Sequence, residues 1–94
     1  MDDLLLSKIR LGVIAELLTS PWVPFSDLQR ATQTTNGNLG AHLAKLVEAG
    51  YLAEEKAFVK RRPQTRYRLT QSGREAFTQH VREMQTLLEQ AGAP

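Results

Sequence analysis

The sequence of 94 residues contains no cysteine, which excludes a disulfide framework, a thiolate metal site and a cysteine nucleophile, and fits a reducing compartment. No apolar run approaches the ~18 residues that a membrane-spanning helix needs. The N-terminus opens with acidic residues and its short leucine run ends at Ser7 and Lys8, so it lacks the basic flank and apolar stretch of a signal peptide. We therefore expect a cytoplasmic protein without a membrane segment.

Acidic residues are missing from one part of the chain. Seven of the twelve basic residues and none of the ten acidic residues lie between Lys56 and Arg74, so a segment of charge +7 interrupts a body of charge −5, although the net charge is only +2. Such asymmetry is typical of a protein that docks a polyanion at one place. The alternative is a solvated loop whose charges serve only solubility.

The length of the chain corresponds to one domain. Its 41% of hydrophobic and 23% of charged residues are close to the averages of soluble globular proteins. No internal repeat, low-complexity tract or linker divides the sequence. Residues 1–94 are therefore expected to fold as a single unit.

Hydrophobic periodicity predicts four helices, over residues 4–18, 27–32, 35–49 and 71–90. The first ends because Pro21 cannot continue the pattern. Ser26 is the expected N-cap of the short second helix, with Gln29 completing a capping box. Thr70 is the expected N-cap of the fourth.

The third helix has two contrasting faces. Thr35 or Asn36 is expected to cap its start, and Gly50 stands where a left-handed C-cap is expected. One face is an apolar stripe, formed by Leu39, Leu43, Leu46 and Val47. The opposite face is small and polar, formed by Gly37, Asn38, Ala41, Lys45 and Glu48. His42 lies on the border, where a place at the edge of the core competes with a phosphate hydrogen bond.

After the third helix the periodicity changes to that of strands. A hairpin is predicted, with strands at residues 51–58 and 65–69. A long, basic, projecting loop at residues 59–64 joins them. In the second strand Tyr67 and Leu69 fall on the side that packs, whereas Arg66 and Arg68 fall on the side that faces outward. The single tryptophan, Trp22, precedes these elements and is expected to be a packing residue.

The fourth helix carries a heptad-like apolar seam, formed by Phe77, Val81, Met84, Leu88 and Ala91 with Leu87 beside it. Such a helix is about 30 Å long, longer than a core of this size covers. Its distal end, residues 84–91, is therefore predicted to be a dimer surface. The alternative is that it folds back on the first helix.

Helix, short helix, helix, basic hairpin and helix is the order of a winged helix-turn-helix, a mainly α fold with a small β-hairpin. The major groove of DNA is about 12 Å wide and admits a helix whose leading face is uncrowded, as that of the third helix is. The basic wing beside it, residues 56–68, is expected to place cations along the phosphates, which releases counterions and adds affinity independent of sequence, or to insert arginine into a minor groove.

Two stretches resemble compact winged-helix transcription regulators related to the MarR and ArsR groups. The recognition-helix resemblance rests on residues 35–39, His42-Leu43, Leu46, Glu48 and Gly50-Tyr51. The wing resemblance rests on residues 61–63, Thr65, Tyr67, Leu69-Thr70 and Gly73. The likeness covers roughly Leu4 to Leu88. It implies a homodimeric bacterial or archaeal regulator that binds double-stranded DNA at a near-palindromic site, with dimer contacts from the first and last helices.

The resemblance and the charge pattern together name the candidate residues. The DNA-binding candidates are Thr35, Asn36, Gly37, Asn38, Ala41, His42, Lys45, Lys60, Arg61, Arg62, Gln64, Thr65, Arg66 and Arg68. The dimer-interface candidates are Leu4, Leu5, Leu11, Phe77, Val81, Met84, Leu87 and Leu88, with residues 71–91 as the dimerisation helix.

The sequence departs from these regulators at two positions, with Gly40 in place of a common serine or alanine and Lys60 in place of a common wing-tip glycine. Metal-sensing relatives use cysteine or clustered histidines, but this chain has only His42 and His80, far apart in sequence. No metal or other cofactor is expected, and a packed or interfacial position is expected for His80. Any small-molecule effector is left open.

No catalytic constellation is present. There is no phosphate-cradling glycine loop, and the adjacent Glu54 and Glu55 point to opposite faces of a strand, so they form no acid–base pair. The alternative function is a protein-interaction module whose basic hairpin docks an acidic partner. RNA binding is less favoured, because the second strand of the hairpin carries one aromatic residue, Tyr67, which does not make the stacking platform of sheet-based RNA readers.

Overall fold

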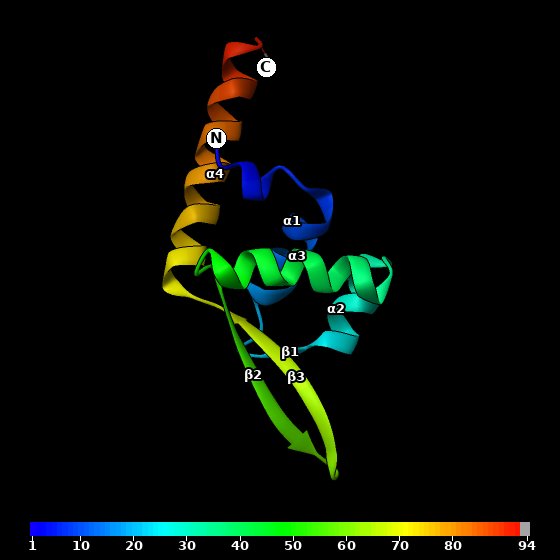
Figure 1. Ribbon diagram of the computed structural model, residues 1–94. Coiled ribbons are helices and arrows are strands. Elements are labelled where there is room, and N and C mark those ends of the chain that lie inside the picture. The colour runs from blue at the N-terminus through cyan, green and yellow to red at the C-terminus, as the bar shows by residue number, and fades with distance from the viewer. Residues whose placement is uncertain (93–94) are drawn as a thin grey trace.

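Helices α1 to α4 lie at one end of a three-stranded antiparallel sheet whose other end projects away from them (Figure 1), and the computed structural model describes residues 1–92. The helices are α1 (Lys8–Leu17), α2 (Phe25–Thr32), α3 (Asn36–Glu48) and α4 (Gln71–Gln90). The strands are β1 (Val23–Pro24), β2 (Leu52–Val59) and β3 (Arg62–Leu69), in the order β1-β3-β2. This arrangement confirms the predicted winged helix-turn-helix and adds the two-residue strand β1.

Side-chain caps set the ends of the third and fourth helices as predicted. Thr35 caps α3 by accepting a hydrogen bond from the backbone N–H of Asn38 at 3.1 Å. Gly50 follows α3 in the left-handed region with φ +82°. Thr70 caps α4 by accepting from the backbone N–H of Gly73 at 3.0 Å. These three signals are local, and each acts where the sequence places it.

The first two helices begin elsewhere than predicted. The chain forms a short 3-10 turn at Asp3–Leu5, and Ser7, in extended backbone, then caps a helix that starts at Lys8 rather than residue 4. Helix α2 starts at Phe25, two residues before the predicted start, because its N-cap is Pro24, at the end of β1. The predicted capping box at Ser26 is therefore wrong.

The core lies between the helices and one face of the sheet. Helix α3 contributes Leu39, Leu43 and Leu46, all almost completely buried, which confirms its predicted stripe. The other buried apolar side chains are Leu5, Val13, Ile14, Leu17, Val23, Leu28, Leu52, Tyr67 and Leu69. Strands β2 and β3 thus reach the core only through the residues nearest the helices, and their far ends project as the wing.

The wing ends in a two-residue turn instead of the predicted six-residue loop. Val59 pairs with Arg62, so only Lys60 and Arg61 connect the strands, and both have left-handed φ values of 51° and 66°. Such a turn matches the twist of the two strands but is normally built from Asn and Gly. Without that signal the sequence pattern understated the length of β3, which was predicted to begin at residue 65, and ended β2 one residue early.

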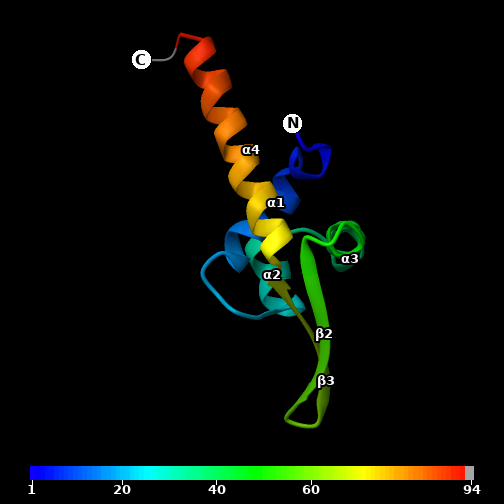
Figure 2. The same ribbon diagram turned by 90° about the vertical axis from the view of Figure 1, so that its left-hand side faces the viewer.

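Helix α4 and the wing project to opposite ends of the molecule (Figures 1 and 2). The molecule measures 55 × 26 × 22 Å and has a radius of gyration of 14.6 Å, above the about 12 Å of a compact chain of this length. Met84, Leu87 and Leu88 on the distal part of α4 are 41%, 48% and 57% exposed. The first helix therefore leaves these side chains uncovered, contrary to the fold-back alternative. No helix in residues 1–92 is both long and apolar enough to cross a bilayer.

Gly73, in the first turn of α4, is packed directly on backbone. A Cβ atom at this position would lie 2.2 Å from the carbonyl oxygen of Tyr51 and 2.8 Å from a methyl carbon of Leu69. Gly73→Ala is therefore expected to lower the free energy of unfolding by about 3 kcal/mol or more, because α4 must shift from the sheet. Chemical denaturation measures this change.

Gly40→Ala is the matched control for Gly73→Ala. Apart from the backbone of its own helix and the adjacent residues, nothing lies within 4 Å of the position of its Cβ, in the middle of α3. The substitution is expected to raise the free energy of unfolding by up to about 1 kcal/mol, because alanine has the higher helix propensity. Equal effects at the two positions would show that Gly73 is not a packing requirement.

Candidate nucleic-acid interface

The exposed face of α3 is as small and polar as the sequence predicts. Its members are exposed and lie opposite the buried leucine stripe: Gly37, Asn38, Ala41 and Lys45. Thr35 and Asn36 are exposed at the N-terminal end of the helix. A Cβ atom at Gly37 would meet nothing within 4 Å. This face offers a flat surface with few long side chains in the way.

Asn38 is oriented by its neighbour in the turn before α3. Its side-chain Nδ2 donates to Thr34 Oγ1 at 2.7 Å, while its own N–H is bound by the capping Thr35. One amide N–H and the amide oxygen of Asn38 have further hydrogen-bonding capacity. A donor and an acceptor side by side form the pair that reads the edge of adenine.

His42 is tied to α1. Its Nδ1 lies 3.2 Å from Arg10 Nη1, and Arg10 Nε donates to the carbonyl oxygen of Leu4. Because a guanidinium has no acceptor, His42 Nδ1 must accept, and the ring proton is on Nε2. Desolvation, followed by the charges of Arg10 and Lys45, lowers the pKa of His42. The half-buried imidazole thus occupies the core edge, one of its two predicted positions, with Nε2–H as its donor.

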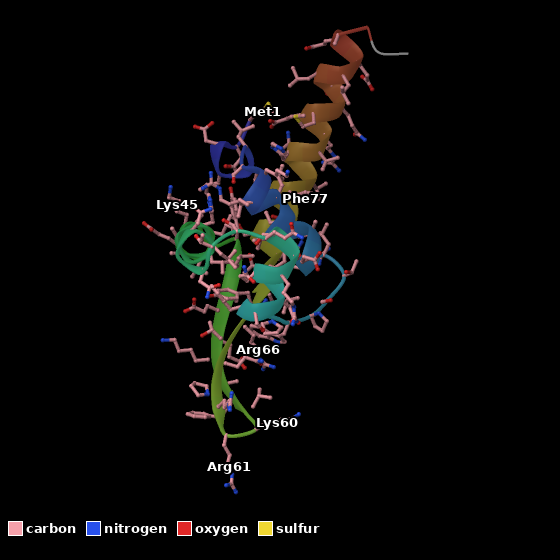
Figure 3. The ribbon with its side chains drawn as sticks, turned by 90° about the vertical axis from the view of Figure 1, so that its right-hand side faces the viewer. Met1, Lys45, Lys60, Arg61, Arg66 and Phe77 are labelled. Carbon is pink, nitrogen blue, oxygen red and sulfur yellow. The ribbon has the colours of Figure 1, made fainter. Side chains whose placement is uncertain are left out.

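The alternation of β2 and β3 divides the wing into two faces. One face continues from the core and is called the helix-bearing face. It carries Lys56 and its cross-strand partner Thr65. Lys60 and Arg61, both exposed, form the tip and point away from the body (Figure 3). The basic segment therefore presents Lys56 and the tip residues at the distal part of the wing.

The opposite, outer face of the wing carries the other predicted arginines. Arg66 Nε donates to Glu55 Oε1 at 3.0 Å, and the Arg66 guanidinium carbon lies 4.7 Å from the ring centroid of Trp22. Arg68 lies over the same ring at 5.5 Å. Trp22 is thus the packing residue that was predicted, as a platform for two cations. Exposed Arg62 and half-buried Gln64 share this outer face.

Tyr67 belongs to the core rather than to the interface. It is 5% exposed, and its hydroxyl donates to Glu54 Oε2 at 2.9 Å. Burial, together with this hydrogen bond, raises the pKa of the phenol well above its usual range. Its hydroxyl is therefore engaged within the hairpin.

The sequence reasoning counted Lys56 in the basic wing, but it did not place Lys56 or Phe58 on a face of the hairpin. Both lie on the helix-bearing face of β2, and Phe58 pairs with Pro63. Their signal was the period-two pattern that runs from Leu52 to Phe58, read through to the far end of the strand. The predicted long loop obscured it, because it detached Pro63 from the hairpin.

A second candidate surface lies between α1 and α4. An open apolar groove of about 480 Å³ is lined by Leu11, Ala15, Phe77, His80, Val81, Met84, Gln85 and Leu88. Five predicted dimer residues thus come together there. His80, at 5% exposure, is packed as expected. The prediction for Leu5 is wrong, because this side chain is completely buried in the core of one chain. Leu4 lies beside Lys45 and Glu48 of α3, away from the groove.

Comparison with known proteins identifies the family. Residues 9–88 match the family model described as a winged helix DNA-binding domain. The chain belongs to this family. An uncharacterised protein of Methanocaldococcus jannaschii is 33% identical to this winged-helix domain over 78 residues, which cover 83% of the domain and 85% of the relative.

The fold of this winged-helix domain is similar to that of solved transcription regulators. A transcriptional regulator homologue from Pyrococcus horikoshii has a TM-score of 0.84 at 27% identity, covering 94% of this chain and 87% of that one. MarR has a TM-score of 0.72 at 19% identity, covering 93% of this chain and 66% of that one, and shows the shared fold alone. The predicted resemblance to winged-helix regulators is confirmed.

Proposed function

We propose that this winged-helix domain is a sequence-specific transcription regulator that binds double-stranded DNA as a homodimer. The observation that carries the proposal is the flat, polar face of α3 beside a wing whose tip is basic and free of acidic residues. The proposed place of action is the cytoplasm, where bacterial and archaeal DNA lies. Any effector that controls binding would act on this assembly.

Helix α3 is the proposed reader of the major groove. Its N-terminal turn and outward face supply Thr35, Asn36, Gly37, Asn38 and Ala41, with Lys45 reaching a phosphate. The absence of bulky side chains on this face lets the helix approach the base edges. His42 Nε2–H, at the border of the face, is a further phosphate donor.

The wing is proposed to bind the DNA backbone or an adjacent minor groove. Lys60 and Arg61 at the tip, and Lys56 with Thr65 on the helix-bearing face, are the closest candidates. Cations of this kind add affinity that falls steeply with salt. Arg66 is already paired with Glu55, so it and the neighbouring Arg68 would support the wing more than contact DNA.

Dimerisation is proposed through α1 and α4, with residues 71–91 as the principal element. The apolar groove and the exposed Leu87 and Leu88 would be covered by the same surface of a second chain, as in a two-fold interface. Two α3 helices about 34 Å apart would then read the halves of a near-palindromic site.

Asn38→Ala is expected to change which sequences are preferred. Loss of its amide should reduce discrimination for adenine at one position of each half-site, by about 1–3 kcal/mol or roughly 5- to 150-fold. Competition binding with single-base variants of the selected site measures this effect. Lys45→Ala is the control, and it should weaken all sequences alike. Identical preferences for the Asn38→Ala and parent proteins would remove Asn38 from the reading face.

Selection of bound sequences from a random DNA library, with the solution mass of the protein measured alongside, tests the proposed function. We expect a two-fold symmetric consensus and the mass of a dimer. A folded protein that enriches no sequence and binds no DNA at 50 mM salt would contradict the proposal. That result would support the alternative of docking to an acidic protein, for which the exposed Arg62 and Arg68 of the outer face provide a surface.

A further inference from the structure

One apolar side chain of the wing has no role in the fold. Phe58 is 80% exposed, more than any other large apolar side chain in residues 1–92. It lies two residues before the turn, far from the core that the same strand reaches through Leu52, which is 3% exposed. A solvated phenyl ring at this point favours a partner that buries it.

Phe58 is backed by a rigid neighbour across the hairpin. Its partner in the ladder is Pro63. Val59 and Arg62 close the two-residue turn and form the hydrogen-bonded pair, so Phe58 and Pro63 form a non-hydrogen-bonded pair, whose side chains lie closest. The Pro63 nitrogen faces the free edge of β3, since β1 pairs only with Arg66 and Tyr67. Phenyl and pyrrolidine rings thus form one apolar ridge.

Cations surround this ridge. Lys60 and Arg61 lie beyond it at the tip (Figure 3), and Lys56 precedes it on the same face of β2. No acidic residue occurs between Lys56 and Arg74. An apolar ridge flanked by positive charge matches the minor groove, where bases lie between two rows of phosphates.

We propose that the ridge of Phe58 and Pro63 is a wedge that inserts at a base step from the minor groove and bends the bound DNA. This inference rests on the proposed DNA-binding function. Lys60, Arg61 and Lys56 hold the phosphates on either side while the phenyl ring partly unstacks the step. A hairpin tip of two strands about 4.8 Å apart enters a groove about 6 Å wide more readily when unstacking opens it.

A protein partner fits the ridge less well. A stable protein interface buries roughly 800 Å² on each side, whereas the ridge consists of two side chains, with Lys56 on one side of it and Lys60 and Arg61 on the other. A second copy of the wing would bring the same positive charges to the contact. The wedge also predicts a preference for pyrimidine–purine steps beside the sequence read by α3, because these steps unstack most easily.

The test compares Phe58→Ala with the parent protein on the selected DNA site. Energy transfer between dyes at the two DNA ends measures the bend, and 2-aminopurine at the flanking step reports unstacking. We expect Phe58→Ala to lose most of the bend, the fluorescence increase and the preference for pyrimidine–purine steps, while its salt slope stays unchanged. Val59→Ala, at a 44% exposed side chain on the other face of the same strand, is the matched control and should behave as the parent.

The outcomes separate the wedge from the proposed function. An unchanged bend and fluorescence response in Phe58→Ala would overturn the wedge and leave DNA binding in place. A uniform loss of affinity with the bend retained would also overturn it, as would a fall in solution mass that assigns Phe58 to a protein contact. Failure of the parent to bind any DNA would overturn both. Unchanged thermal unfolding of Phe58→Ala, expected for an exposed ring, shows that the variant is folded.

Discussion

Replacing the wing tip with the double substitution Lys60→Asn and Arg61→Gly is expected to stabilise the protein and weaken its binding to DNA at the same time. Both residues have left-handed backbone, with φ values of 51° and 66°, which is unfavourable by roughly 1–2 kcal/mol for an ordinary side chain. Asn and Gly adopt this conformation most readily. The free energy of unfolding is therefore expected to rise by about 1–2 kcal/mol, seen as an increase of several degrees in Tm.

The same substitution removes two of the proposed phosphate contacts in each subunit. Affinity is expected to fall at least about tenfold for all DNA sequences alike, and the slope of log affinity against log salt should lessen by about 2 for each wing. Titrations at several salt concentrations between 50 and 200 mM measure both quantities. Folding stability and the proposed DNA affinity therefore favour different residues at the tip. Asn and Gly would relieve the strain of the turn, whereas Lys60 and Arg61 supply the cations.

Arg82→Gln is the control for the wing-tip variant, because it removes an exposed charge from α4. It should change neither the salt slope nor the turn. A wing-tip variant that gained stability but bound DNA as tightly as the parent would exclude the tip from the interface. One that lost stability would contradict the strain assigned to the turn.

The double substitution Leu87→Glu and Leu88→Glu is expected to convert the proposed dimer to a folded monomer. These side chains are 48% and 57% exposed in the single chain, so acids there should leave the monomer stable, whereas burying four carboxylates in a two-fold interface is strongly unfavourable. Loss of the second subunit removes the gain from bivalent binding. Affinity for the complete site should fall by about 10²–10⁴, to that for a half-site.

Sedimentation and DNA titration measure the two effects of this variant. The matched control is Gln71→Glu with Thr78→Glu, which adds the same charge at two exposed positions of α4 that lie together on another part of its surface, away from the groove. The control should remain a dimer and bind the complete site. A dimeric Leu87→Glu and Leu88→Glu protein would place the subunit contact elsewhere.

The extent to which the sequence predicted this fold differs between local and non-local features. The cap Thr70 and the left-handed Gly50 were predicted at the correct residues, and Thr35 is one of the two predicted caps of α3, because each satisfies its own helix end through neighbours in the chain. The buried stripe of α3 followed from periodicity in the same way. The predicted start of α2 was wrong, because β1 pairs with β3 as far as Pro24 and the helix begins at the next residue, Phe25.

The candidate interface shows the same division. Charge counting located the basic segment, and alternation placed Arg66 and Arg68 opposite Tyr67. Alternation alone did not show that Trp22, more than 40 residues earlier, lies beneath both guanidinium groups. That contact, with the Arg66–Glu55 pair, separates the arginines of the outer face from the cations of the tip.

Local chemistry thus accounts for the winged-helix architecture and for the segments that carry its charge, since caps, periodicity and net charge depend on neighbouring residues. Packing between distant residues decided the rest. Cross-strand pairing up to Val59 and Arg62 forced the tip into a strained two-residue turn, the core enclosed Leu5, and the hairpin left Phe58 in solvent beside Pro63. Each of these outcomes depends on contacts that form only when the chain closes on itself.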